Sequence, residues 1–132
     1  MGSRILVIED NRMNLELMTY LLNAFGHETA VARDGEEGIE TAMRIRPDLI
    51  LCDLALPGLD GFGVANRLKG DAGFPRIPLI AVTASAMVGD REKVLARGFD
   101  GYIAKPITPE TFVADVERYL HGGPPDGNDT RR

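Results

Sequence analysis

Short apolar runs alternate with amphipathic stretches along this chain of 132 residues. Each run is followed by a segment whose apolar positions recur every three or four residues, which is the spacing of one helix face. A strand-then-helix order that repeats five times predicts a parallel sheet covered by helices. The expected strands are residues 5–8, 27–32, 49–52, 79–82 and 102–104.

The amphipathic stretches predict five helices whose ends carry capping residues. The first is expected at about residues 11–25 and the fourth at residues 90–97, with Gly26 and Gly98 ending them. The expected starting caps are Asp34 with Glu37, Asp60, and Thr108 followed by Pro109. The expected inward positions are Leu15, Met18, Leu21, Leu22 and Phe25, then Ile39, Ala42 and Met43, then Phe62, Ala65 and Leu68, then Val94 and Leu95, and finally Phe112, Val113, Val116 and Leu120.

Length and composition fit a single domain, which we place at residues 1–121. Residues 122–132 are rich in Gly, Pro, Asp and Arg, so we expect a disordered tail there.

The net charge of -5 argues against direct nucleic-acid binding. No apolar stretch approaches the ~20 residues of a membrane helix, so we expect no membrane insertion. The single Cys52 is expected to be a small buried hydrophobe, which fits a reducing, cytoplasmic setting.

Four of the apolar runs end in polar residues able to bind phosphate or metal. These residues are Glu9 with Asp10, then Asp53, Thr83 and Lys105. Because parallel strands end on one edge of a sheet, and open α/β sheets bind ligands at that edge, the four run ends predict one site. Taken singly, Asp10 or Asn11 is equally well explained as a helix cap, so the argument rests on the combination of residues. Asp53 is less well explained as a turn residue, because a charge at the end of an apolar strand needs solvent or a partner.

Carboxylates that meet at such a site repel one another. At ~4 Å and an effective dielectric constant near 20, each pair costs about 4 kcal/mol. Either one carboxylate takes up a proton or a cation binds, and an all-oxygen site with few protein ligands suits Mg²⁺. Lys105 adds a positive charge and Thr83 a hydroxyl donor, which together favour phosphoryl transfer with an aspartate as the nucleophile.

Several other kinds of site find no support in the sequence. The chain has neither a P-loop nor a G-x-S-x-G motif. His27 and His121 lack ligand-like spacing and are expected at the surface. The methionines Met13, Met18, Met43 and Met87 are expected to fill the core.

Residues 4–120 closely resemble the receiver domain of two-component response regulators, of the chemotaxis-regulator kind. The matching segments are residues 8–11 (IEDN), 47–53 (PDLILCD), 56–61 (LPGLDG), 83–84 (TA) and 102–107 (YIAKPI). The resemblance implies a flavodoxin-like (βα)5 three-layer α/β sandwich, with a five-stranded parallel sheet of order 2-1-3-4-5.

The resemblance also implies roles for individual residues. Asp53 would be the phosphoacceptor, and Thr83 and Lys105 would contact the phosphoryl group. Mg²⁺ would be bound by Asp10, Asp53 and the backbone carbonyl of Ala55, with Glu9 acting through a bound water. Tyr102 occupies the position of the switch aromatic, although packing at the sheet edge would also explain an aromatic residue there. The Lys105-Pro106 bond is the candidate for a cis peptide.

The partners implied are a histidine kinase or histidine phosphotransfer protein and a downstream protein target. The target would bind the face formed by residues 86–97, residues 101–104 and the helix from Pro109, and a phosphorylation-dependent dimer is a further expectation. We expect a stand-alone regulator, or a receiver excised from a hybrid kinase or larger regulator, and no enzyme beyond its own phosphorylation and dephosphorylation.

Three alternatives stay open. The first is a small aspartate-nucleophile phosphatase, which needs a second Asp where this chain has Ala55. The second is a flavin-binding module of the same topology, which would carry a hydroxyl-rich phosphate loop in place of Glu9 and Asp10. The third is a degenerate receiver that acts only through protein binding, against which the intact set of site residues argues.

Overall fold

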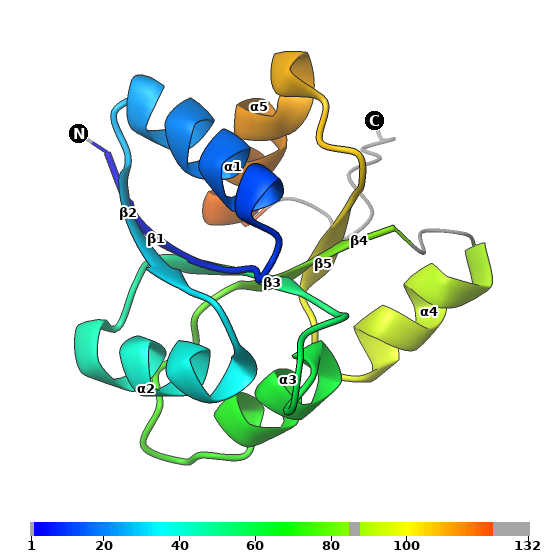
Figure 1. The fold of residues 1–132 in the computed structure, drawn as a ribbon. Coiled ribbons are helices and arrows are strands. Elements are labelled where there is room, and N and C mark those ends of the chain that lie inside the picture. The colour runs from blue at the N-terminus through cyan, green and yellow to red at the C-terminus, as the bar shows by residue number, and fades with distance from the viewer. Residues whose placement is uncertain (1, 85–87, 123–132) are drawn as a thin grey trace.

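Strands and helices alternate throughout the computed structural model, which describes residues 2–84 and 88–122 (Figure 1). The elements are β1 (Arg4–Ile8), α1 (Arg12–Ala24), β2 (Glu28–Ala32), α2 (Gly35–Ile45), β3 (Leu49–Asp53), α3 (Gly61–Lys69), β4 (Leu79–Thr83), α4 (Val88–Ala96), β5 (Gly101–Ala104) and α5 (Pro109–Leu120). All five expected strands and all five expected helices are confirmed, and their ends differ by at most two residues from those that the sequence predicts.

The five strands form one parallel sheet in the order β2-β1-β3-β4-β5. Helices α1 and α5 cover one face, while α2, α3 and α4 lie on the other (Figure 1). This arrangement is the expected flavodoxin-like (βα)5 sandwich, with β2 at one edge. Register pairs such as Ile8 with Cys52 and Asp53 with Val82 bring the carboxyl ends of β1, β3 and β4 together.

Alternating strand residues divide the core into two layers. On β1, Ile5 and Val7 pack with α1 and α5, while Leu6 and Ile8 pack with α2 and α3. The central strands β3 and β4 are buried at every position, which explains why they appear as continuous apolar runs. Cys52 is fully buried, as expected.

The predicted N-terminal caps are largely confirmed. The Asp34 carboxylate accepts from the Glu37 N–H at 2.8 Å, and the Asp60 carboxylate accepts from the Gly63 N–H at 2.9 Å. The Glu37 side chain binds the Arg33 N–H, one residue before the cap, instead of completing the reciprocal bond of a capping box. Thr108 occupies the N-cap position of α5 without a side-chain capping bond.

Three expectations about burial are wrong. His27 is buried, because its Nδ1 accepts from the Ser3 N–H at 3.0 Å and its Nε2 lies 2.8 Å from a Glu117 carboxylate oxygen, so both ring nitrogens have partners inside the fold. Met13 is exposed because it lies off the inward stripe of α1 that Leu15, Met18 and Leu22 form. Phe25 continues the spacing of that stripe but is exposed because it lies beyond the last residue of α1.

Several other inward positions are only partly buried, and some expectations lie outside the described residues. The partly buried side chains are Leu21, Met43, Phe62, Leu95 and Leu120. Met87 and the tail beyond Gly122 are not described.

No helix in the described ranges combines the length and the apolar character needed to cross a bilayer.

Candidate functional site

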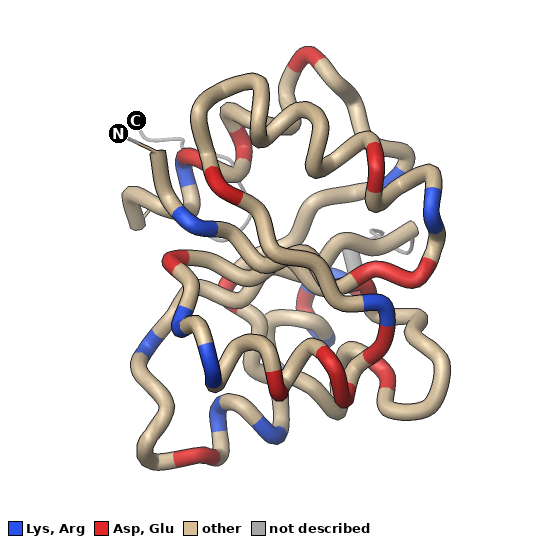
Figure 2. Tube along the Cα trace, turned by 60° about the vertical axis from the view of Figure 1, so that its left-hand side comes forward, with Lys and Arg blue, Asp and Glu red and all other residues tan. Residues whose placement is uncertain are grey.

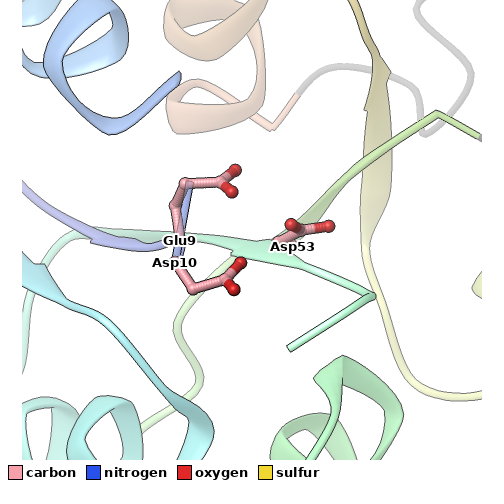
Figure 3. A group of neighbouring side chains, drawn as sticks. All are labelled: Glu9, Asp10 and Asp53. Atoms are coloured by element: carbon pink, nitrogen blue, oxygen red, sulfur yellow. The ribbon is translucent and has the colours of Figure 1, made fainter. Parts of the chain in front are cut away.

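The three acidic residues expected at the sheet edge do meet. Glu9 and Asp10 directly follow β1, and Asp53 is the last residue of β3, so the register of the two strands places them side by side. Each offers a carboxylate oxygen within 4.8 Å of the others. Figure 3 shows the Glu9 and Asp10 carboxylates turned to the side on which Asp53 lies. Glu9 is 0% exposed and Asp53 6%, whereas Asp10 is open to solvent.

Lys105 lies between two of these acids. It follows β5, where its N–H donates to the Thr83 carbonyl at 2.9 Å and continues the pairing beyond the strand. Its Nζ lies 3.0 Å from Asp53 Oδ2 and 3.1 Å from Glu9 Oε1. The side chain is 16% exposed, so this ion-paired group is shielded from bulk water. The Lys105–Pro106 peptide is cis, as the sequence predicts.

Backbone N–H groups hold the second oxygen of each buried carboxylate. The Ala55 N–H donates to Asp53 Oδ1 at 3.1 Å, and the Asn11 N–H donates to Glu9 Oε2 at 3.1 Å. The Asn11 side chain is itself the cap of α1, because it accepts from the Asn14 N–H at 2.9 Å. The Asp10 carboxylate is therefore not needed as a helix cap.

The electrostatics of the site follow from burial and close charges. Burial raises the pKa of Glu9 above its usual range, and the Asp53 charge adds to this, although the Asn11 N–H and Lys105 act in the opposite direction. Burial alone would lower the pKa of Lys105, but hydrogen bonds and charge from Asp53 and Glu9 outweigh it and raise that pKa. Burial also raises the pKa of the Cys52 thiol, so this neighbour of Asp53 stays neutral.

The donor set fits a small divalent cation. Of the three carboxylates, Glu9 and Asp53 share the Lys105 ammonium group, and all the available ligand atoms are oxygens, which is the chemistry that Mg²⁺ prefers. Glu9, Asp10 and Asp53 are the residues that could hold the ion.

A cavity of about 360 Å³ opens over Asp53. Thr83, buried at the end of β4, and Lys105 line it together with Asp53. Residues of α3 and α4 also line it, among them Phe62 and Lys93, neither of which the sequence argument assigned to a site. Their contribution arises from helix packing, which has no local sequence signature.

Tyr102 does not line this cavity. It is half-buried on β5, where its hydroxyl accepts a hydrogen bond from Arg91 Nη1 at 2.6 Å and the Arg91 guanidinium lies 5.5 Å from the ring centroid. The Tyr119 hydroxyl donates to the Tyr102 carbonyl at 3.2 Å and lies 3.4 Å from its N–H. The side chain and backbone of Tyr102 are thus held by α4 and α5, through two residues that the sequence did not single out.

Residues 5–117 match the response regulator receiver domain family. DivK, a polar-differentiation response regulator of Brucella anthropi, is 42% identical over 120 residues, which cover 91% of this chain and 98% of that protein. DivK of Brucella abortus is 41% identical over the same length.

Solved structures agree with this assignment. The receiver domain of the sensor histidine kinase PA1611 from Pseudomonas aeruginosa is 34% identical with a TM-score of 0.83, covers 92% of this chain over its own full length, and has a magnesium ion coordinated in its active site cleft. The chemotaxis regulator CheY4 of Vibrio cholerae, at 24% identity and a TM-score of 0.84, shares the fold, with 89% of this chain and 98% of that chain covered. With matching sequence, fold and acidic edge, the chain belongs to the response regulator receiver domain family of two-component systems.

Proposed function

We propose that Asp53 accepts a phosphoryl group from a phosphohistidine, with Mg²⁺ as the cofactor. The observation that supports this best is the environment of the Asp53 carboxylate. It lines the cavity, one oxygen faces Lys105 at 3.0 Å, the other accepts from the Ala55 N–H, and Glu9 and Asp10 lie within 4.8 Å. A carboxylate held in this way is already oriented, so little conformational freedom is lost when a donor arrives.

In the transfer step, an Asp53 oxygen forms a bond to phosphorus while the bond from phosphorus to the leaving group breaks. Lys105 and Thr83 line the cavity, and their ammonium and hydroxyl groups would bind the oxygens of the phosphoryl group. Mg²⁺, when bound, supplies neutralisation of the negative charge that would otherwise repel an anionic donor.

The proposed metal ligands are Asp10, Asp53 and the backbone carbonyl of Ala55, with Glu9 acting through a bound water. The convergence of the three acids supports this set. The magnesium ion in the active site cleft of the PA1611 receiver domain supports it by analogy.

Phosphorylation would be transmitted by Thr83 and Tyr102 to the face formed by α4, β5 and α5. For Tyr102 to turn inward, the 2.6 Å bond from Arg91 must break, so part of the cost of switching lies in that contact. Moving the equilibrium between the conformations with Tyr102 outward and Tyr102 inward from 1:99 to 99:1 takes about 5.5 kcal/mol of differential stabilisation. New bonds from Lys105 and Thr83 to the phosphoryl group would contribute to this sum.

The partners we propose are a histidine kinase or histidine phosphotransfer protein as donor and a protein target for the α4-β5-α5 face. A phosphorylation-dependent dimer would use the same face.

The protein would act in the cytoplasm, as a signalling phosphoacceptor that catalyses its own phosphorylation and dephosphorylation and turns over no other substrate. Its receiver domain would span residues 1–121. Charged residues of both signs are interspersed along the trace in Figure 2, which favours protein partners over nucleic acid.

The test is the intact mass of the protein after incubation with acetyl phosphate and Mg²⁺. We expect a gain of one phosphoryl group, lost when Mg²⁺ is omitted and in Asp53→Asn. Asp60→Asn is a matched control, because Asp60 lines the same cavity while asparagine preserves the cap of α3. An unchanged wild-type mass, or equal labelling of Asp53→Asn, would refute the proposal.

A further inference from the structure

Strand β5 lies at one edge of the sheet, so one side of its backbone faces away from the other strands. Its neighbour in the strand order is β4 (Figure 1). Successive residues of a parallel strand direct their backbone N–H and C=O groups to opposite sides. The Lys105 N–H bonds the Thr83 carbonyl of β4, so Tyr102, three residues earlier, directs its N–H and C=O to the free edge. These are the groups that an additional strand would bind.

The Tyr119 hydroxyl binds both of these backbone groups. It donates to the Tyr102 carbonyl at 3.2 Å and accepts from the Tyr102 N–H at 3.4 Å. One hydroxyl on α5 therefore makes the two contacts that the backbone of a neighbouring strand would make. Burial raises the pKa of Tyr119, so its hydroxyl keeps the proton that it donates at neutral pH.

Close packing holds the Tyr119 ring in this position. The residue is 4% exposed, although it lies next to an edge strand. A Cβ at position 101 would overlap the Cε1 and Cζ atoms of the ring, so the absence of a side chain at Gly101 is what lets the ring lie against β5. The Arg118 guanidinium also lies 5.5 Å from the ring centroid. Uncovering the edge would therefore break several buried contacts.

We propose that the Tyr119 side chain blocks the free edge of β5 and so prevents this strand from pairing with β5 of a second copy of the chain. Edge strands with free backbone groups pair readily with other strands. Tyr102 lies within a strand of four residues and offers one donor and one acceptor. In an antiparallel pair related by a two-fold axis, each Tyr102 would exchange both bonds with its counterpart, so a second copy is the partner that an uncovered β5 fits best.

The block limits how the α4-β5-α5 face can be used. While Tyr119 binds the Tyr102 backbone, a dimer on this face has to be built from side chains, because the backbone bonds of Tyr102 are already made. This consequence rests on the proposed function, which places a phosphorylation-dependent dimer there. The block itself does not, and it is tested on the unphosphorylated protein.

The test measures self-association of the full chain by sedimentation equilibrium, in the wild type and in Tyr119→Leu. Leucine keeps an apolar side chain on α5 but cannot hydrogen-bond Tyr102. We expect the association constant to rise about tenfold, the change that two backbone hydrogen bonds would give. Adding Ala104→Lys, at an exposed position of β5, should restore the wild-type value, because a charge on an edge strand opposes pairing. Adding Val31→Lys, at an exposed position of the opposite edge strand β2, is the matched control and should leave the rise unchanged.

The outcomes decide the proposal in each case. A folded Tyr119→Leu protein that associates no more than the wild type would overturn it, and so would a rise that Ala104→Lys does not reverse or that Val31→Lys abolishes. Circular dichroism shows whether the variant folds. If it does not, Tyr119→Phe decides, because it keeps the ring against Gly101 and removes only the hydroxyl. We then expect a smaller rise that Ala104→Lys again reverses, and no rise would overturn the block. Failure to label Asp53 would refute the proposed function and leave this result unaffected.

Discussion

Replacing Glu9 by glutamine should stabilise the metal-free protein while weakening its response to Mg²⁺. Glu9 is completely buried, and its two oxygens face the Asn11 N–H and Lys105. Glutamine has nearly the same shape and can still accept the Asn11 hydrogen bond through its amide oxygen. The change therefore removes one negative charge from the cluster and little else.

The size of the effect follows from two opposing interactions. With the carboxylate oxygens of Glu9 and Asp53 no more than 4.8 Å apart, their repulsion is at least about 3.5 kcal/mol at an effective dielectric constant near 20. On the same scale the attraction of Glu9 to Lys105 at 3.1 Å is about 5 kcal/mol, so it is the cost of burying the carboxylate that reverses the balance. Burial, with the Asp53 charge, raises the pKa of Glu9, so the charged form is disfavoured overall. We expect a gain of about 1 kcal/mol, or roughly 4 °C in melting temperature.

Urea unfolding at pH 7 without divalent cations measures the expected gain in unfolding free energy. Glu40→Gln is the control, because it removes the same negative charge at an exposed site of α2. Mg²⁺ at 100 times its dissociation constant should then stabilise the wild type by about 2.7 kcal/mol. Glu9→Gln should gain less, because one participant in the cation site is lost.

The pH dependence gives an independent check. Because burial raises the Glu9 pKa, the native state binds more protons than the unfolded state between the ordinary value of 4.5 and the native value. Glu9 therefore makes stability fall as pH rises through this window, and the advantage of Glu9→Gln should disappear toward pH 4.5. A variant that is less stable than the wild type at pH 7 without cations, with an undiminished Mg²⁺ response, would refute this reasoning.

Three further predictions concern other contacts. Lys105→Gln leaves Glu9 and Asp53 without their shared cation and should lower the unfolding free energy by about 3 kcal/mol in the absence of Mg²⁺; an unchanged urea midpoint would contradict the ion-pair assignment. Tyr119→Phe removes the hydroxyl between the Tyr102 N–H and carbonyl, so hydrogen exchange at the Tyr102 amide should accelerate, and unaltered exchange would contradict the contact. Phe112→Ala should cost about 3–5 kcal/mol in calorimetry, because this side chain is 1% exposed, and a loss below 1 kcal/mol would be inconsistent with its packing.

The fold was predictable because its signals are local. Continuous apolar runs such as residues 49–52 correspond to strands buried on both faces, and Asp34 and Asp60 start helices as capping chemistry requires. The convergence of Glu9, Asp10 and Asp53 was predictable from the rule that parallel strands end on one edge.

What could not be predicted depends on contacts between distant segments. His27 was expected at the surface, but its two partners come from Ser3 and Glu117, and no spacing rule connects them. The contact of Arg91 with Tyr102 likewise depends on how α4 lies against β5. The exposure of Phe25 shows the limit of periodicity, because a stripe that fits the helix can extend past the point where the sheet covers it.

The most direct test of the account is to identify the residue that carries the phosphoryl group. Wild-type protein is incubated with acetyl phosphate, with and without Mg²⁺, and borohydride then reduces any aspartyl phosphate to homoserine before peptide mass mapping. The account predicts homoserine at position 53 alone and only in the sample with Mg²⁺. Reduction at another aspartate, such as Asp10 or Asp60, or the same yield without Mg²⁺, would contradict it.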